Sequence, residues 1–145
     1  MTPCTKTAVV AATMVLLAGC GGGSEGASAP SSSADESLGK VTTGAGGVQE
    51  VTLQTQDDYV FTPDHFTVQP GKVRLTVVNV AEQMTHNFDF TSGTGPAQID
   101  SGIDLLAPGQ EMTIDFTVET PGDYPFECSF HEQLGQVGTM TVSGP

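Results

Sequence analysis

Residues 112–118 read Met-Thr-Ile-Asp-Phe-Thr-Val, and apolar and polar side chains alternate along the whole segment. Successive side chains of a β-strand point to opposite faces of a sheet, so this pattern predicts a strand that is buried on one face only. The buried face would carry Met112, Ile114, Phe116 and Val118.

Further strands are predicted on both sides of this segment. Residues 73–77 alternate in the same way, and Val78 and Val80 indicate that this strand is covered on both faces near its end. No segment has the 3.6-residue periodicity of an amphipathic helix, so the chain is predicted to be all-β, with a sandwich or small barrel. Five shorter apolar segments also predict strands: 48–53, 66–68, 86–90, 123–127 and 137–142.

The charge of the chain is strongly negative. The 145 residues include 17 acidic side chains against four Lys and Arg, which gives a formal charge of −13. Nucleic acids are bound through clustered Lys and Arg, so this composition argues against a nucleic-acid partner. The acidity itself names no function, because it serves solubility as readily as docking to a cationic partner.

The first 19 residues have the features of an export signal. An apolar run of about 12 residues follows Lys6. This run is too short to cross a bilayer, because a membrane-spanning helix needs roughly 20 residues. The sequence LAGC at 17–20 resembles the bacterial lipobox, in which the chain is cleaved before the cysteine and the cysteine is acylated. Residues 1–19 are therefore predicted to be a lipoprotein signal peptide and Cys20 the lipidation site. The protein would be exported and anchored on the outer face of the cytoplasmic membrane or elsewhere in the cell envelope.

Residues 20–47 are rich in Gly, Ser and Ala, which predicts a flexible tether. Cleavage before Cys20 would remove Lys6 but none of the acidic side chains, so the charge would become −14. The folded domain is expected to extend over 48–145.

Only one of the three cysteines, Cys128, lies in the predicted domain. His131 follows it three residues later, and a second imidazole, His86, lies in the segment MTHN at 84–87. A thiolate and two imidazoles are the trigonal ligand set of a blue-copper site, which a weak axial ligand usually completes. The sequence therefore predicts one type 1 copper held by His86, Cys128 and His131.

The segments NVAEQMTHN (79–87) and YPFECSFHEQLGQVGTMTV (124–142) resemble those of the plastocyanin-like cupredoxins. The resemblance extends in order and spacing over residues 48–142. It implies a Greek-key β-sandwich of about 7–8 strands, with one histidine from a strand end and the other ligands from a single loop. It also implies that Asn87 and Ser129 tie the two ligand segments together by hydrogen bonds.

The axial position departs from the commonest pattern of this family. The commonest loop has Met five residues after the second histidine, where this chain has Gln136. The family also contains members with a Gln ligand, so the resemblance implies coordination by the Gln136 amide oxygen. The alternatives are Met84 or no protein group at all, whereas Met140 lies roughly 13 Å further along the strand and is expected in the core. The third histidine, His65, alternates out of phase with its apolar neighbours and is expected to face solvent.

These residues predict an electron-transfer protein rather than an enzyme. With three histidines in total, the chain has too few ligands for the further copper ions of multicopper oxidases or nitrite reductases. The family implies that electrons pass through His131, and Leu134 and Gly135 would form part of an apolar docking surface for a redox protein, such as a cytochrome or a copper oxidase or reductase. Two alternatives stay open: a copper carrier or buffer that uses the same ligands without redox cycling, and an interaction module without metal.

Overall fold

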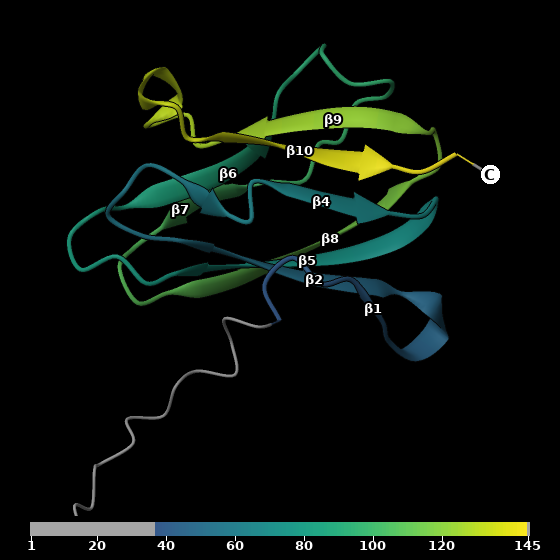
Figure 1. Cartoon of the computed structure of the whole chain (residues 1–145), viewed down its shortest axis with the longest axis horizontal. Coiled ribbons are helices and arrows are strands. Elements are labelled where there is room, and N and C mark those ends of the chain that lie inside the picture. Colours follow the sequence, from purple (N-terminus) through teal and green to yellow (C-terminus); the bar gives the residue numbers. More distant parts are fainter. Residues whose placement is uncertain (1–36, 145) are drawn as a thin grey trace, which may run out of the picture. The chain divides into compact units, whose positions relative to one another are not determined.

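The computed structural model describes residues 37–144, so the predicted signal peptide, Cys20 and most of the predicted tether lie outside the described residues. Within this range no helix has the length and apolar character needed to cross a membrane. Ten strands and two short 3-10 turns make up the fold of residues 37–144 (Figure 1). The strands are β1 (Thr42–Thr43), β2 (Gln49–Thr55), β3 (Phe61–Thr62), β4 (His65–Val68), β5 (Gly71–Asn79), β6 (His86–Phe90), β7 (Ile103–Leu106), β8 (Glu111–Val118), β9 (Gly122–Glu127) and β10 (Val137–Val142), and the turns are η1 (Ala45–Gly47) and η2 (Glu132–Leu134).

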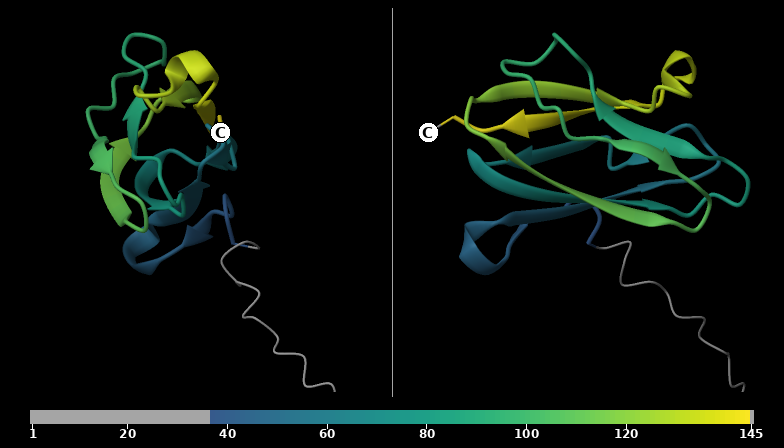
Figure 2. Two further views of the ribbon diagram at one scale, coloured as in Figure 1. Left: turned by 90° about the vertical axis from the view of Figure 1, so that its left-hand side faces the viewer. Right: turned by 180° about the vertical axis from the view of Figure 1, so that it is seen from behind.

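The strands form two mixed sheets. One sheet has the order β1-β2-β5-β8, with β3 paired to β2, and the other has the order β4-β10-β9-β6-β7. The pairs β2–β5 and β4–β10 are parallel, while the other pairs are antiparallel. Figure 2 shows the two sheets facing each other, which encloses a single core between them.

Aromatic side chains fill the core next to the strands that carry the predicted ligands. The ring centroids of Phe88 and Phe126 are 5.0 Å apart, and Phe61 packs edge-on against Phe126 at 5.3 Å. Phe88 lies two residues after His86, and Phe126 lies two residues before Cys128. Side chains two residues apart in a strand share a face, so the packing of the two rings directs both predicted ligands inward.

The structure confirms the all-β sandwich, and β6 and β10 have the predicted bounds. It contains more strands than the expected 7–8, because β1 and β3 are two-residue strands and β7 was not predicted. In β7 the buried residues are Ile103 and Leu106, which are three positions apart. The pairing of β6 with β7 also shifts register between His86 and Phe88. Because of the three-residue spacing and the register shift, the sequence of β7 lacks the alternation of apolar and polar residues by which a strand is recognised.

Two expectations about burial are wrong. Met112 is 43% exposed because β8 is the edge strand of its sheet, although Phe116 and Val118 further along the strand are buried. Val80 is 46% exposed because β5 ends at Asn79 and the chain turns away there.

The C-terminal end of the predicted tether is ordered rather than flexible. Residues 42–43 form β1, which pairs with the edge of β2, and Gly39 donates a backbone hydrogen bond to the carbonyl of Thr52 at 2.8 Å. Gly46 and Gly47, with φ of 71° and 77°, allow the tight turn between β1 and β2. Backbone pairing thus extends the domain on its N-terminal side into residues with few apolar side chains.

Candidate metal centre

The predicted ligands come from two segments at one end of the sandwich. His86 is the first residue of β6, and Cys128 directly follows β9. His131 lies in the turn between β9 and β10, and Gln136 directly precedes β10. Figure 1 shows the turn at η2 and the connection between β5 and β6 at the same end of the molecule. The fold therefore brings together residues that are 50 positions apart in the chain.

One imidazole from β6 and a thiol and imidazole from the turn converge on a single point. The donor atoms of His86, Cys128 and His131 all lie within 4.8 Å of one another. Cys128 Sγ is 3.9 Å from His86 Nδ1 and 3.5 Å from His131 Nδ1. His86 and Cys128 are completely buried, while His131 is half-buried. A soft thiol with two imidazoles at these separations fits one copper ion.

The Gln136 side chain is also buried in this cluster. Its Oε1 lies 2.8 Å from His86 Nδ1 and 3.0 Å from His131 Nδ1, and its Nε2 donates a hydrogen bond to Thr55 Oγ1 at 2.7 Å. The amide therefore presents its oxygen, which has lone pairs, to the same point as the two ring nitrogens.

The surroundings of His86 favour the metal-binding form of its ring. Burial lowers the pKa of His86 and outweighs the hydrogen bond to Gln136, which acts in the opposite direction. The positive charge of a protonated His131 would lower the pKa of His86 further. A neutral imidazole is the form that binds a metal ion.

Asn87 links the two ligand segments. Its backbone N–H donates to Cys128 Sγ at 3.4 Å. Its side-chain Nδ2 donates to Ser129 Oγ at 2.7 Å, and its Oδ1 accepts the backbone N–H of Ser129 at 2.7 Å. These are the contacts that the sequence resemblance implies for Asn87 and Ser129. They hold the sulfur and the β6 imidazole in a fixed relation.

The loop 128–136 is closed by its own backbone hydrogen bonds. The N–H of Cys128 donates to the carbonyl of Gln136 at 3.0 Å, and the N–H of His131 donates to the carbonyl of Cys128 at 2.9 Å. The N–H of Gln136 in turn donates to the carbonyl of His131 at 3.2 Å. Gly135, with φ of 95°, supplies the left-handed residue that ends η2. The three predicted ligands of this loop are thus mutually fixed.

Three residues near the centre were not predicted from the sequence. The Thr55 hydroxyl accepts a hydrogen bond from Gln136. Tyr59, whose backbone has a φ of 58°, places its ring edge-on to the His131 ring, with the two centroids 5.1 Å apart. The Asp57 carboxylate accepts the backbone N–H groups of residues 82, 83 and 84 at 2.7, 3.3 and 2.9 Å, and these bonds lower its pKa. An aspartate after a strand is an ordinary turn signal. Nothing in the pattern relates any of the three to the loop that carries His131.

The other candidate side chains have different surroundings. His65 is exposed, as expected, and its Nδ1 lies 2.9 Å from Asp64 Oδ1. Met140 is completely buried in the core, also as expected. Met84 is half-buried, and Asn79 Nδ2 donates a hydrogen bond to its backbone carbonyl. It is Gln136 whose side chain lies within hydrogen-bonding distance of both imidazoles.

Comparison with known proteins identifies the family. Residues 48–143 match the family of copper-binding proteins described as plastocyanin/azurin. The chain belongs to the plastocyanin/azurin family. It is 38% identical over 102 residues to plastocyanin from Cucumis sativus, which covers 65% of this chain and 99% of that protein. It is also 38% identical over 107 residues to chloroplastic plastocyanin from Oryza sativa subsp. indica, which covers 68% of this chain and 67% of that protein.

A solved cupredoxin structure supports the same conclusion. The reduced auracyanin of the photosynthetic bacterium Roseiflexus castenholzii superposes with a TM-score of 0.59 at 25% identity, covering 66% of this chain and 97% of that one. Proteins of the plastocyanin/azurin family bind copper, and the His86–Cys128–His131 cluster fits one type 1 copper ion. This plastocyanin-like cupredoxin is therefore a copper protein of an electron-transfer family.

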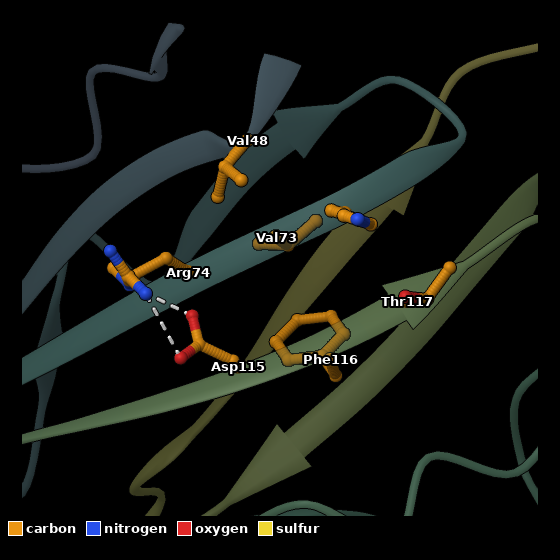
Figure 3. A pocket seen from close by; sticks show the side chains of 7 residues that line it. Val48, Val73, Arg74, Asp115, Phe116 and Thr117 are labelled. Carbon is orange, nitrogen blue, oxygen red and sulfur yellow. Dashed lines mark hydrogen bonds and ion pairs between the residues drawn. The ribbon is translucent and has the colours of Figure 1, made fainter. Parts of the chain in front are cut away.

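A surface hollow lies elsewhere on the cupredoxin sandwich (Figure 3). Its volume is about 280 Å³, and it lies over the beginning of β5 and the end of β8, whereas the metal centre lies beyond the end of β5. Arg74 and Asp115 both line it and form an ion pair, with Arg74 Nε 2.8 Å from Asp115 Oδ1, which lowers the pKa of Asp115. None of the predicted ligands lines this hollow. The lining residues are Val48, Lys72, Val73, Arg74, Asp115, Phe116 and Thr117.

Three carboxylates interact on the sheet that carries the ligands. Asp89 on β6 faces Glu127 on β9 in register and interacts electrostatically with Asp104 on β7. Burial raises the pKa of Asp89, and the charges of Asp104 and Glu127 raise it further. Because the pKa is higher in the folded than in the unfolded chain, ionised Asp89 destabilises the fold. Stability should increase as the pH falls through the pKa that Asp89 has in the folded domain.

We expect Asp89→Asn to raise the melting temperature of the metal-free domain by about 2 °C at pH 7. The difference should shrink as the pH falls from 7 through the raised pKa of Asp89, because the parent protein then loses this charge as well. Asp115→Asn is a matched control with the opposite sign, because Arg74 lowers the pKa of Asp115. Thermal unfolding of the three proteins across this pH range is the measurement. An unchanged or lower melting temperature for Asp89→Asn at pH 7 would contradict the expectation.

Proposed function

We propose that this protein carries single electrons between redox partners outside the cytoplasm and is not an enzyme. Its copper ligands would be His86, Cys128 and His131, with the amide oxygen of Gln136 in the axial position. The observation that carries the proposal is the buried convergence of the four donor atoms, in which Gln136 Oε1 lies within 3.0 Å of both ring nitrogens. Bound copper supplies one-electron chemistry, because it cycles between Cu(II) and Cu(I).

The fixed positions of the ligand side chains support electron transfer over metal delivery. Cys128 Sγ accepts a backbone hydrogen bond, and the Asn87–Ser129 pair ties the two ligand segments together. A site that delivers its metal to another protein must open. A site that cycles between Cu(II) and Cu(I) transfers electrons fastest when its ligands need not move. Hydrogen bonds around metal ligands hold them in this way.

His131 is the proposed route for electrons. It is the half-buried member of the ligand cluster, and exposed apolar side chains surround it in sequence. Phe130 is 51% exposed and Leu134 is 59% exposed, and Gly135 lies next to Leu134. We propose these residues as a docking surface for a redox protein, since a small apolar surface allows close contact that is easily reversed.

The charge of the chain supports a cationic partner. The 17 acidic side chains exceed the basic ones by 13, so a positive redox protein, such as a cytochrome or a copper oxidase or reductase, would be steered toward it. The lipobox-like sequence at 17–20 supports export and a lipid anchor on Cys20. Both the partner and the anchor are part of the proposal.

Reduction of the copper-loaded domain by a cationic one-electron reductant, hexaammineruthenium(II), tests the function. We expect rapid reduction, full recovery of the Cu(II) spectrum on reoxidation, and one copper per chain throughout. Because attraction to a negative protein is screened by salt, the rate constant should fall between 10 mM and 500 mM ionic strength. With anionic ferrocyanide, the rate constant should rise over the same range.

The carrier alternative predicts a different outcome of the same experiment. A carrier would lose its copper during the redox cycle, or would pass Cu(I) to a chelating acceptor on the timescale of reduction. Either result would replace the electron-transfer proposal. A protein that stays colourless with Cu(II) would instead indicate an interaction module.

A further inference from the structure

The side-chain amide of Gln136 has two chemically different ends, and each end has its own partners. Oε1 lies 2.8 Å from His86 Nδ1 and 3.0 Å from His131 Nδ1, whereas Nε2 donates to Thr55 Oγ1 at 2.7 Å. Gln136 and Thr55 are both completely buried. We infer that Thr55 is a positioning residue, which holds the amide with its oxygen toward the copper site and its nitrogen away from it. This inference rests on the proposed axial role of Gln136.

The location of Thr55 suits this role because its backbone is held on both sides. It is the last residue of β2, in register with Asn79 of β5 and Phe61 of β3. Its carbonyl also accepts the backbone N–H of Val80 at 2.9 Å. The branched side chain has few rotamers available. The sheet opposite the ligand loop therefore offers a fixed hydroxyl to Gln136.

The hydrogen bond to Thr55 affects the amide oxygen as well as the amide nitrogen. An amide oxygen has lone pairs for a metal ion, whereas the NH2 group offers only hydrogens. Donation of an N–H to Thr55 polarises the amide and increases the negative charge on Oε1 of Gln136. Without that acceptor, a buried N–H would lack a partner, and the amide would be driven to turn or shift. Thr55 thus acts on the metal only through Gln136.

The test compares Thr55→Val, which removes the acceptor with little change of shape, with Thr55→Ser, which keeps it. We expect Thr55→Val to bind Cu(II) about 10–100-fold more weakly in competition with a chelator of known affinity. Its reduction potential should rise, and its Cu(II) paramagnetic-resonance spectrum should change. Thr55→Ser should retain most of the wild-type affinity for Cu(II) and the wild-type spectrum. The matched control Thr52→Val, on the other face of β2, should leave all three measurements unchanged.

A double-mutant cycle separates this inference from the proposed function. A thioether has no N–H to donate, so Thr55→Val should have no further effect in a Gln136→Met background. If Thr55→Val behaves as wild type while Gln136→Met shifts the potential, the role of Thr55 is wrong and the axial role of Gln136 stands. If Gln136→Met itself shifts nothing, the axial role fails and the inference fails with it. Circular dichroism checks the fold, and Thr55→Ala replaces Thr55→Val in the cycle if the valine variant does not fold.

Discussion

Cys128→Ser should abolish the intense visible absorption that Cu(II) produces in the wild-type protein. The absorption of a blue-copper site arises from electron transfer within the copper–thiolate bond, and a serine hydroxyl is neither soft nor ionised at neutral pH. Cys128 is the only cysteine among residues 37–144, so no other thiol in the described domain can replace it. We expect complete loss of the band, measured by absorption and paramagnetic resonance after one equivalent of Cu(II) is added.

The chain offers a matched control for the Cys128→Ser experiment. His65 is an exposed histidine paired with Asp64 outside the cluster, so His65→Ala should keep the full absorption. Circular dichroism would show whether Cys128→Ser retains the sandwich, as expected for a change of one atom in the side chain. A coloured Cys128→Ser protein, or a colourless wild type, would refute the copper centre.

Gln136→Met should raise the reduction potential. A thioether is softer than an amide oxygen and stabilises Cu(I) relative to Cu(II). We expect the ratio of the affinity for Cu(I) to the affinity for Cu(II) to rise at least tenfold. For a one-electron couple this corresponds to a rise of about 59 mV in the reduction potential. Cyclic voltammetry of the copper-loaded domain measures this shift directly.

Two further variants locate the axial ligand. Gln133→Met makes the same change on an exposed residue of η2 and should leave the potential unchanged. Met84→Leu removes the rival thioether and should also leave it unchanged. A potential that responds to Met84→Leu but does not rise in Gln136→Met would assign the axial position to Met84.

The ligand set could be predicted because its residues have unusual chemistry in an ordinary β pattern. Cys128 is the one thiol of the predicted domain, and His86 and His131 are the only histidines besides the solvent-facing His65. The resemblance to the plastocyanin-like cupredoxins then implies that His86 comes from a strand end and that the other ligands come from a single loop. In the structure the side chains of His86, Cys128, His131 and Gln136 lie close together.

Two supporting residues, Thr55 and Asp57, could not be predicted, because their roles come from contacts that are distant in the sequence. Thr55 lies 81 positions from Gln136, and a threonine at the end of a strand has no local feature that relates it to a glutamine in a loop. Asp57 likewise acts on the backbone of residues 82–84, about 25 positions away. Burial of Met112 was overestimated for a related reason. Alternation predicts which face of a strand is apolar, but the sheet order makes β8 an edge.

The self-closed loop 128–136 concentrates most of the proposed copper ligands in one short segment of the chain. Three of the four proposed copper ligands lie within nine residues, and the backbone bonds that shape them start and end inside the same stretch. A substitution at position 136 could thus adapt the driving force to a new redox chain while the sandwich and its folding stay the same. A laboratory graft of this loop onto a related scaffold should carry the redox properties with it, provided that the recipient also supplies counterparts of His86 and Thr55.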